Sequence, residues 1–82
     1  MSIDVKIYTI EKTLFDGEAD SVTLPGSDGE LGVLAIHTPL ISSLQRGIIK
    51  IRNKNAEKFI EIQGGFVEIQ PESRVVVLAN QR

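Results

Sequence analysis

The sequence contains no cysteine, which excludes disulfides and thiolate metal sites as sources of stability. It has a single histidine, so a metal site built from several imidazoles is excluded as well. A reducing interior fits this composition best. A strong excess of one sign of charge is also missing, because the chain has 9 lysines and arginines and 11 aspartates and glutamates. This mild acidity gives no electrostatic reason to bind nucleic acid or anionic lipid.

Long apolar runs are absent, and none approaches the ~20 residues that a membrane-spanning helix needs. The opening MSIDVKIY alternates from Ile3 onward and lacks the apolar block of a signal peptide. We therefore expect a soluble, intracellular chain that something else would hold at a membrane. Its 82 residues are enough for a single domain, 1–82.

What the chain does have is a hydrophobic period of two, which is typical of half-buried strands. Polar and apolar residues alternate, or short apolar runs occur, in segments 3–8, 22–24, 49–52, 60–63, 66–70 and 74–79. Turn signals separate the segments: Asp16-Gly17 as a hairpin dipeptide, Pro25-Gly26 at a strand end, 53–56 and 71–73. This spacing predicts an antiparallel all-β sandwich or barrel, without an amphipathic helix of useful length.

The segment GSDGELGVLAIHTPL, residues 26–40, carries three glycines, two acids and the only histidine. As pure structure, its glycines permit a tight reversal and Glu30 is a solvated turn acid. Its apolar residues would then point into the sandwich: Leu31, Val33, Leu34 and Ile36. Residues 37–44 that follow are expected to form a short irregular strand or at most one helical turn.

A catalytic interpretation of this segment is poorly supported. His37 could be a general base oriented by Glu30 or Asp28. However, no serine lies in a nucleophile-elbow context, and no Gly-rich phosphate loop is followed by a helix. We expect no catalytic residue, no metal and no cofactor.

Two binding interpretations centre on the turn at 53–56. Lys54 lies between two asparagines at a hairpin tip, the place where lipoyl or biotinyl carrier domains present a modified lysine. The flanking residues lack the usual carrier context, so a stand-alone binding or lysine-modified carrier module remains the alternative. For nucleic acid, the basic residues near this turn are interleaved with Glu57 and Glu61. The phenylalanines are expected to be needed for the core.

Two stretches together resemble a known family: LFDGEADSVTLPGSDGELGVLAIHTPLISSLQRGIIKI and GGFVEIQPESRVVVLA. Their order and spacing are similar to the N-terminal domain of the epsilon subunit of F-type ATP synthases. The resemblance runs from about Ile3 to Ala79. It departs from the family pattern at Ala35-Ile36, where Pro-Gly is common, at Thr38 and at Gln63.

The resemblance implies a flattened, ten-stranded antiparallel β-sandwich made of two five-stranded sheets. It also implies a non-catalytic rotor subunit in the central stalk, which links the gamma subunit to the membrane c ring and couples ion translocation to ATP synthesis. Such a subunit is a peripheral membrane protein on the cytoplasmic side of the bacterial inner membrane, or the thylakoid equivalent. In the full family a helical hairpin that restrains ATP hydrolysis follows this domain. The chain ends near where that hairpin would begin, so we expect it to couple without inhibiting.

Site residues carried over from the family pattern fall into two groups. Asp28 and Glu30 match the loop that meets the c ring. Thr9, His37 and Ser42 match positions that face the gamma subunit.

Overall fold

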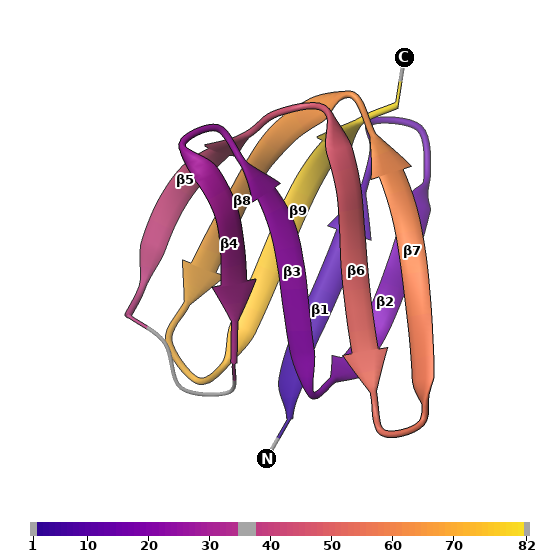
Figure 1. Ribbon diagram of the computed structural model, residues 1–82, viewed down its shortest axis with the longest axis vertical. Coiled ribbons are helices and arrows are strands. Elements are labelled where there is room, and N and C mark those ends of the chain that lie inside the picture. Colours follow the sequence, from indigo (N-terminus) through magenta and orange to yellow (C-terminus); the bar gives the residue numbers. More distant parts are fainter. Residues whose placement is uncertain (1, 35–37, 82) are drawn as a thin grey trace.

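The computed structural model describes residues 2–34 and 38–81, which fold into two packed layers of β-strands (Figure 1). The strands found in these residues are β1 (Ile3–Tyr8), β2 (Thr13–Ala19), β3 (Ser21–Gly26), β4 (Gly29–Val33), β5 (Leu40–Leu44), β6 (Gly47–Asn53), β7 (Ala56–Ile62), β8 (Gly64–Gln70) and β9 (Arg74–Asn80). No helix that could cross a lipid bilayer is present among the described residues.

One hydrogen-bonded path connects the strands in the order β2-β1-β9-β8-β5-β3-β6-β7, and β4 pairs with β3 beside it. In Figure 1 the layer β4-β3-β6-β7 lies in front of the layer β5-β8-β9-β1-β2. The path passes between the layers at one point, where Gly26 of β3 pairs with Leu44 of β5. On the other side, the Asn53 side-chain amide of β6 donates to the Glu18 carbonyl of β2 over 3.1 Å. The layers are therefore tied together along both sides.

The expected all-β sandwich is confirmed, with differences in detail. Residues 2–34 and 38–81 contain nine strands where ten were expected, and they form one hydrogen-bonded sheet instead of two five-stranded sheets. One neighbouring pair, β1 with β9, is parallel. This pairing sets Val5 beside Val75 and Ile7 beside Val77, so all four buried side chains enter the core together.

The expected hairpin at Asp16-Gly17 is wrong. Both residues lie inside β2, where they pair with Lys6 and Val5 of β1. The Phe15 ring lies 3.4 Å from the point where a Gly17 Cβ would be, so an aromatic side chain covers the glycine. Pairing with β1 therefore overrides the local turn preference.

Period-two alternation builds a core that is apolar throughout. Among the described residues, no buried side chain is polar or charged. The largest fully buried side chains are Ile3, Ile7, Leu24, Ile49, Ile62, Val5, Val22, Val33, Val67, Val75 and Val77. All of these residues except Leu24 are β-branched. Such residues pack well on a pleated surface, and their χ1 is already restricted before folding.

The expectation that the phenylalanines fill the core is wrong for two of the three. Phe59 is 59% exposed and Phe66 is 60% exposed, whereas Phe15 is partly buried against the core. The reason is strand phase: Phe59 precedes the inward Ile60, and Phe66 precedes the inward Val67. Because successive side chains alternate between faces, both rings point outward.

Candidate functional site: an acidic hairpin tip and an apolar groove

The β3–β4 hairpin ends in a tight tip, defined here as residues 26–30. Gly26 pairs with Gly29, and Ser27 and Asp28 form the two-residue turn between them. Gly29 has a φ of 130°, a conformation that residues with a side chain rarely adopt. The expectation of a tight glycine-permitted reversal is therefore confirmed.

The tip presents two carboxylates to solvent. Asp28 and Glu30 are both exposed, and within the described part of the chain neither is bridged to a lysine or arginine. A two-residue turn gives the chain little freedom, and the β3–β4 turn lies at one end of the sandwich (Figure 1). Asp28 in this turn and Glu30 just after it are therefore close together in the chain at that end. Such a tip can offer negative charge to a basic partner without first breaking an internal ion pair.

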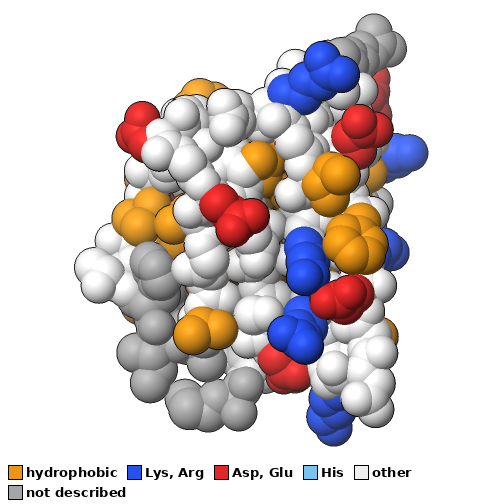
Figure 2. All heavy atoms as spheres, viewed as in Figure 1, with side chains coloured by type: hydrophobic (Ala, Val, Ile, Leu, Met, Phe, Trp, Pro, Cys, Tyr) orange, Lys and Arg blue, Asp and Glu red, His pale blue; other side chains and the backbone are white. Residues whose placement is uncertain are grey.

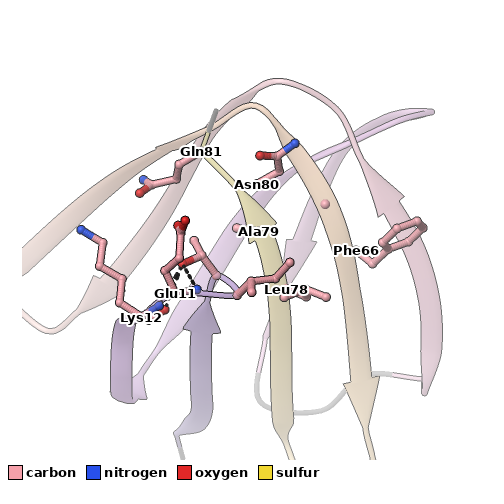
Figure 3. A pocket seen from close by; sticks show the side chains of 10 residues that line it. Glu11, Lys12, Phe66, Leu78, Ala79, Asn80 and Gln81 are labelled. Carbon is pink, nitrogen blue, oxygen red and sulfur yellow. Dashed lines mark hydrogen bonds between the residues drawn. The ribbon is translucent and has the colours of Figure 1, made fainter.

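A groove of about 420 Å³ lies on the outer face of the other layer. Its walls come from three segments that are distant in the sequence: the β1–β2 turn, the start of β8 and the end of β9 (Figure 3). Leu78 lies between Lys12 on one side and Phe66 on the other. The lining residues are Thr9, Ile10, Glu11, Lys12, Gly65, Phe66, Leu78, Ala79, Asn80 and Gln81.

The wall formed by the β1–β2 turn is held by the Thr9 hydroxyl. It accepts hydrogen bonds from the amides of Glu11 (3.2 Å) and Lys12 (3.1 Å). The Thr9 amide in turn donates to the Lys12 carbonyl over 2.8 Å. A side-chain oxygen that caps its own turn in this way fixes the path of the backbone. The turn consequently presents Ile10 to solvent, where it is 95% exposed.

Apolar side chains continue across the outer face of this layer. Phe66 of β8 pairs with Leu78 of β9, and Leu78 pairs with Tyr8 of β1. Ile41 of β5, two residues before the partner of Phe66, is 74% exposed. An exposed apolar surface of several neighbouring side chains is a common feature of protein-binding faces.

The residues expected to act at sites are placed differently by the structure. Asp28 and Glu30 lie together at the tip, and Thr9 lines the groove. Ser42 is half-buried and pairs with the inward Val67, and two strands, β8 and β9, separate its strand β5 from β1. His37 lies outside the described residues. The structure therefore brings the two acids together but does not bring Thr9 and Ser42 together.

Sequence reasoning missed the apolar wall of the groove. The sequence did contain a signal for this wall. Ile10 is a large apolar residue in a turn, and Phe66 and Leu78 are large apolar residues at positions that alternate with the buried residues of their strands. Large apolar residues at outward positions are the pattern that marks a contact face.

The opposite outer face, formed by β6 and β7, gives no support to the other binding interpretations. Figure 2 shows basic and acidic side chains intermixed there, with apolar side chains between them. Lys50 and Glu57 form an ion pair of 3.3 Å. The Lys54 amide donates to Asp20 Oδ2 over 2.7 Å, so this turn is tied to the neighbouring corner. The described residues of this face therefore form no continuous basic stripe for a nucleic-acid backbone.

The described residues contain no cluster of side chains that could bind a metal ion. No group of three or more histidine, cysteine, aspartate or glutamate side chains gathers in residues 2–34 and 38–81. The features that stand out are thus the tip and the groove, which are suited to contacts with other proteins.

Comparison with known proteins identifies the family. The model of the β-sandwich domain of the ATP synthase delta/epsilon chain matches residues 2–82. The chain belongs to this family. Related ATP synthase epsilon chains include that of Nostoc sp., 37% identical over 82 residues, and that of Bordetella petrii, 46% identical over 80 residues. The alignments cover 98% and 96% of this chain, but only 59% and 56% of those relatives.

The fold of this delta/epsilon-chain domain is also found in solved structures. A chain in the Euglena gracilis mitochondrial ATP synthase, in a structure of its OSCP, F1 and c ring, superposes with a TM-score of 0.89 and 21% identity. That match covers 95% of this chain and 50% of the other. A chain in the central stalk and c ring of the Tetrahymena thermophila enzyme gives a TM-score of 0.79 at 18% identity, covering 98% and 64%. At these identities the likeness shows the fold.

Proposed function

We propose that this domain acts as the epsilon-type rotor subunit of an F-type ATP synthase. In this role it is non-catalytic, links the gamma subunit to the c ring in the central stalk, and couples ion translocation to ATP synthesis. The family match over residues 2–82 is the observation that carries the proposal. The chain spans little more than half of the related epsilon chains, so the role of the complete subunit is part of the proposal.

The acidic tip is proposed as the contact with the c ring. Asp28 in the two-residue turn and Glu30 in the first residues of β4 are both exposed, which supports a contact made by charge. Basic groups in the polar loops of the ring are the chemical complement. A charge pair at the edge of an interface contributes mainly to encounter and register and less to affinity.

The gamma subunit is proposed to bind the groove and the apolar face around it. Ile10, Phe66 and Leu78 supply apolar contact area, and Thr9 acts by holding the turn that carries Ile10. Ser42 and His37 belong to the expected gamma-facing set. For Ser42, whose side chain is on the inward phase of β5, the effect on gamma would pass through the position of the strand.

Transmission of torque requires a domain that resists deformation, and the packing of this domain is consistent with such rigidity. Two layers share one close-packed apolar core, and the strands are joined by short turns. The subunit would sit at the membrane surface through the complex, on the cytoplasmic side or its thylakoid equivalent.

Copurification tests the proposed partners. An affinity-tagged chain expressed in its native host should bring gamma and c subunits with it from detergent-solubilised membranes. Recovery of the tagged chain without either subunit would overturn the proposed role. Intact mass of the recovered chain tests the carrier alternative, because a modified Lys54 would add a covalent group.

Charge reversal tests the proposed tip contact. Glu30→Lys should lower ATP-driven proton pumping while leaving the unfolding midpoint of the chain unchanged. Glu72→Lys is the matched control, since Glu72 is an exposed acid in the β8–β9 turn at the other end of the sandwich (Figure 1). Equal pumping by the two variants would remove the tip from the ring contact.

A further inference from the structure

We propose that Ser43 is a positioning residue that holds the acidic tip in a fixed orientation relative to the layer that carries the groove. The structural part of this inference stands on hydrogen bonds within the chain. Its functional part, that the two surfaces must be presented together to two partners, rests on the proposed function.

The tip needs such a link because β3 changes partners before it ends. The β3–β6 ladder comprises the pairs from Ser21 to Thr23. Beyond it, Pro25 has no amide hydrogen to donate, and Gly26 pairs with Leu44 of β5. The end of the hairpin is therefore joined to the body through β5 and no longer through its earlier neighbour.

Three hydrogen bonds tie the tip to β5 and to the residue that follows it. The Ser27 amide donates to the Ser43 carbonyl over 3.0 Å, and the Gln45 amide donates to the Pro25 carbonyl over 2.8 Å. The Ser43 hydroxyl donates to Ser27 Oγ over 2.8 Å. Two backbone bonds alone would leave the turn able to pivot about their line. The hydroxyl bond adds a contact on the side-chain face of β5, which opposes that motion.

Ser43 also lies at one end of a cross-strand row that reaches the groove. It pairs with Phe66, Phe66 pairs with Leu78, and Leu78 pairs with Tyr8. Residues in register on one face of a sheet are direct neighbours, with Cβ atoms about 5 Å apart. The serine that holds the tip is thus next to the wall of the groove, although the two surfaces come from different layers.

Amide hydrogen exchange of the 82-residue chain tests the structural part. In Ser43→Ala, the Ser27 and Gln45 amides should exchange about fivefold faster, the effect expected from losing one hydrogen bond of ordinary strength. Ser43→Thr keeps the hydroxyl and should restore wild-type exchange. Ser27→Ala should match Ser43→Ala, and the double variant should be no worse than either single one.

The control is Ser2→Ala, which removes another exposed serine bond, from Ser2 Oγ to Glu18 Oε1 at 3.0 Å. It should leave the Ser27 and Gln45 amides unchanged. Unchanged exchange in Ser43→Ala would overturn the inference. A uniform rise across all strands would overturn it as well, because that result indicates general destabilisation and no specific hold on the tip.

Proton pumping by the assembled ATP synthase tests the functional part. Ser43→Ala should lower ATP-driven pumping less than Glu30→Lys does, and Ser43→Thr should restore it. If Glu30→Lys uncouples and Ser43→Ala pumps normally, the positioning role is overturned while the ring contact stands. If neither variant affects pumping, the proposed ring contact fails, and hydrogen exchange alone decides whether Ser43 holds the tip.

Discussion

Single residues decide the shape of the groove through the backbone. Gly65, at the wall of the groove, has a φ of 149°, and a Cβ there would overlap the Leu78 carbonyl oxygen. Thr9 likewise fixes the backbone of the β1–β2 turn, because its hydroxyl accepts hydrogen bonds from the amides of Glu11 and Lys12. Each of these two residues therefore determines where its apolar neighbours lie.

Replacing Gly65 by alanine should destabilise the chain by about 2 kcal/mol or more, because strain at φ and the overlap with Leu78 act together. Urea unfolding followed by circular dichroism measures the change. Gly32→Ala is the control, since a Cβ at Gly32 would meet no heavy atom within 4 Å. We expect its effect to be within about 0.5 kcal/mol. Similar losses for both variants would contradict the assignment of strain to Gly65.

Thr9→Val keeps the shape of the side chain but removes the turn-capping oxygen. It should cost about 1 kcal/mol of unfolding free energy, whereas Thr9→Ser should cost less. Amide exchange at Glu11 and Lys12 should rise in the valine variant, because their acceptor is gone. Protected amides at both positions in Thr9→Val would show that the hydroxyl is not what holds the turn.

At the scale of the strands, the alternation of side chains explains why a face rich in apolar side chains is left exposed. In β8 and β9 the inward residues Val67 and Val77 fill the core, and the outward Phe66 and Leu78 follow from the same alternation. The strand phase that builds the core therefore also builds the groove. This coupling restricts how far the outer face can change without moving the core.

Phe66→Ser and Leu78→Ser should weaken binding of the gamma subunit, each by about tenfold or more if the side chain is an anchor of the interface. The unfolding midpoint should change little, because both side chains are at least partly exposed. Phe59→Ser is the matched control, being an equally exposed phenylalanine on the opposite outer face. Binding by isothermal calorimetry or pull-down with purified gamma would decide. Equal loss in the control would place the contact elsewhere.

At the scale of the whole molecule, stability rests mainly on the burial of apolar side chains. There is no cysteine to form a disulfide, and the buried side chains of the described residues are all apolar. At 82 residues, typical stabilities per residue correspond to about 4–12 kcal/mol in total. Each core side chain is consequently a large part of the margin.

Ile7→Ala should lower the free energy of unfolding by about 2–5 kcal/mol, since it opens a cavity in a core that is fully enclosed at this point. The loss is a substantial fraction of the total, so partial unfolding near 37 °C is expected. Ile41→Ala, at a 74% exposed position, should change stability by less than about 0.5 kcal/mol. Thermal and urea unfolding measure both. A small effect at Ile7 would mean that the core relaxes to close the cavity.

Local patterns in the sequence were enough to predict the all-β class and the approximate positions of β1, β3, β6, β7, β8 and β9, but they missed β2 and β4. They also placed the turns at 53–56 and 71–73, and the reversal that carries Asp28 and Glu30. The physical reason is that strand phase, turn chemistry and a two-residue hairpin involve neighbours in the chain. The family resemblance added the sandwich and is confirmed by the match to residues 2–82.

Only the tertiary structure decided the parallel pairing of β1 with β9, the placement of Asp16-Gly17 inside a strand and the exposure of two phenylalanines. The groove was also decided by the tertiary structure, because its walls come from three segments that are distant in the sequence: residues 9–12, 65–66 and 78–81. These features depend on which strands become neighbours across the fold. The pairing of strands that are distant in the sequence is determined by burying the apolar faces of all the strands together. It therefore cannot be predicted from any single segment of the sequence.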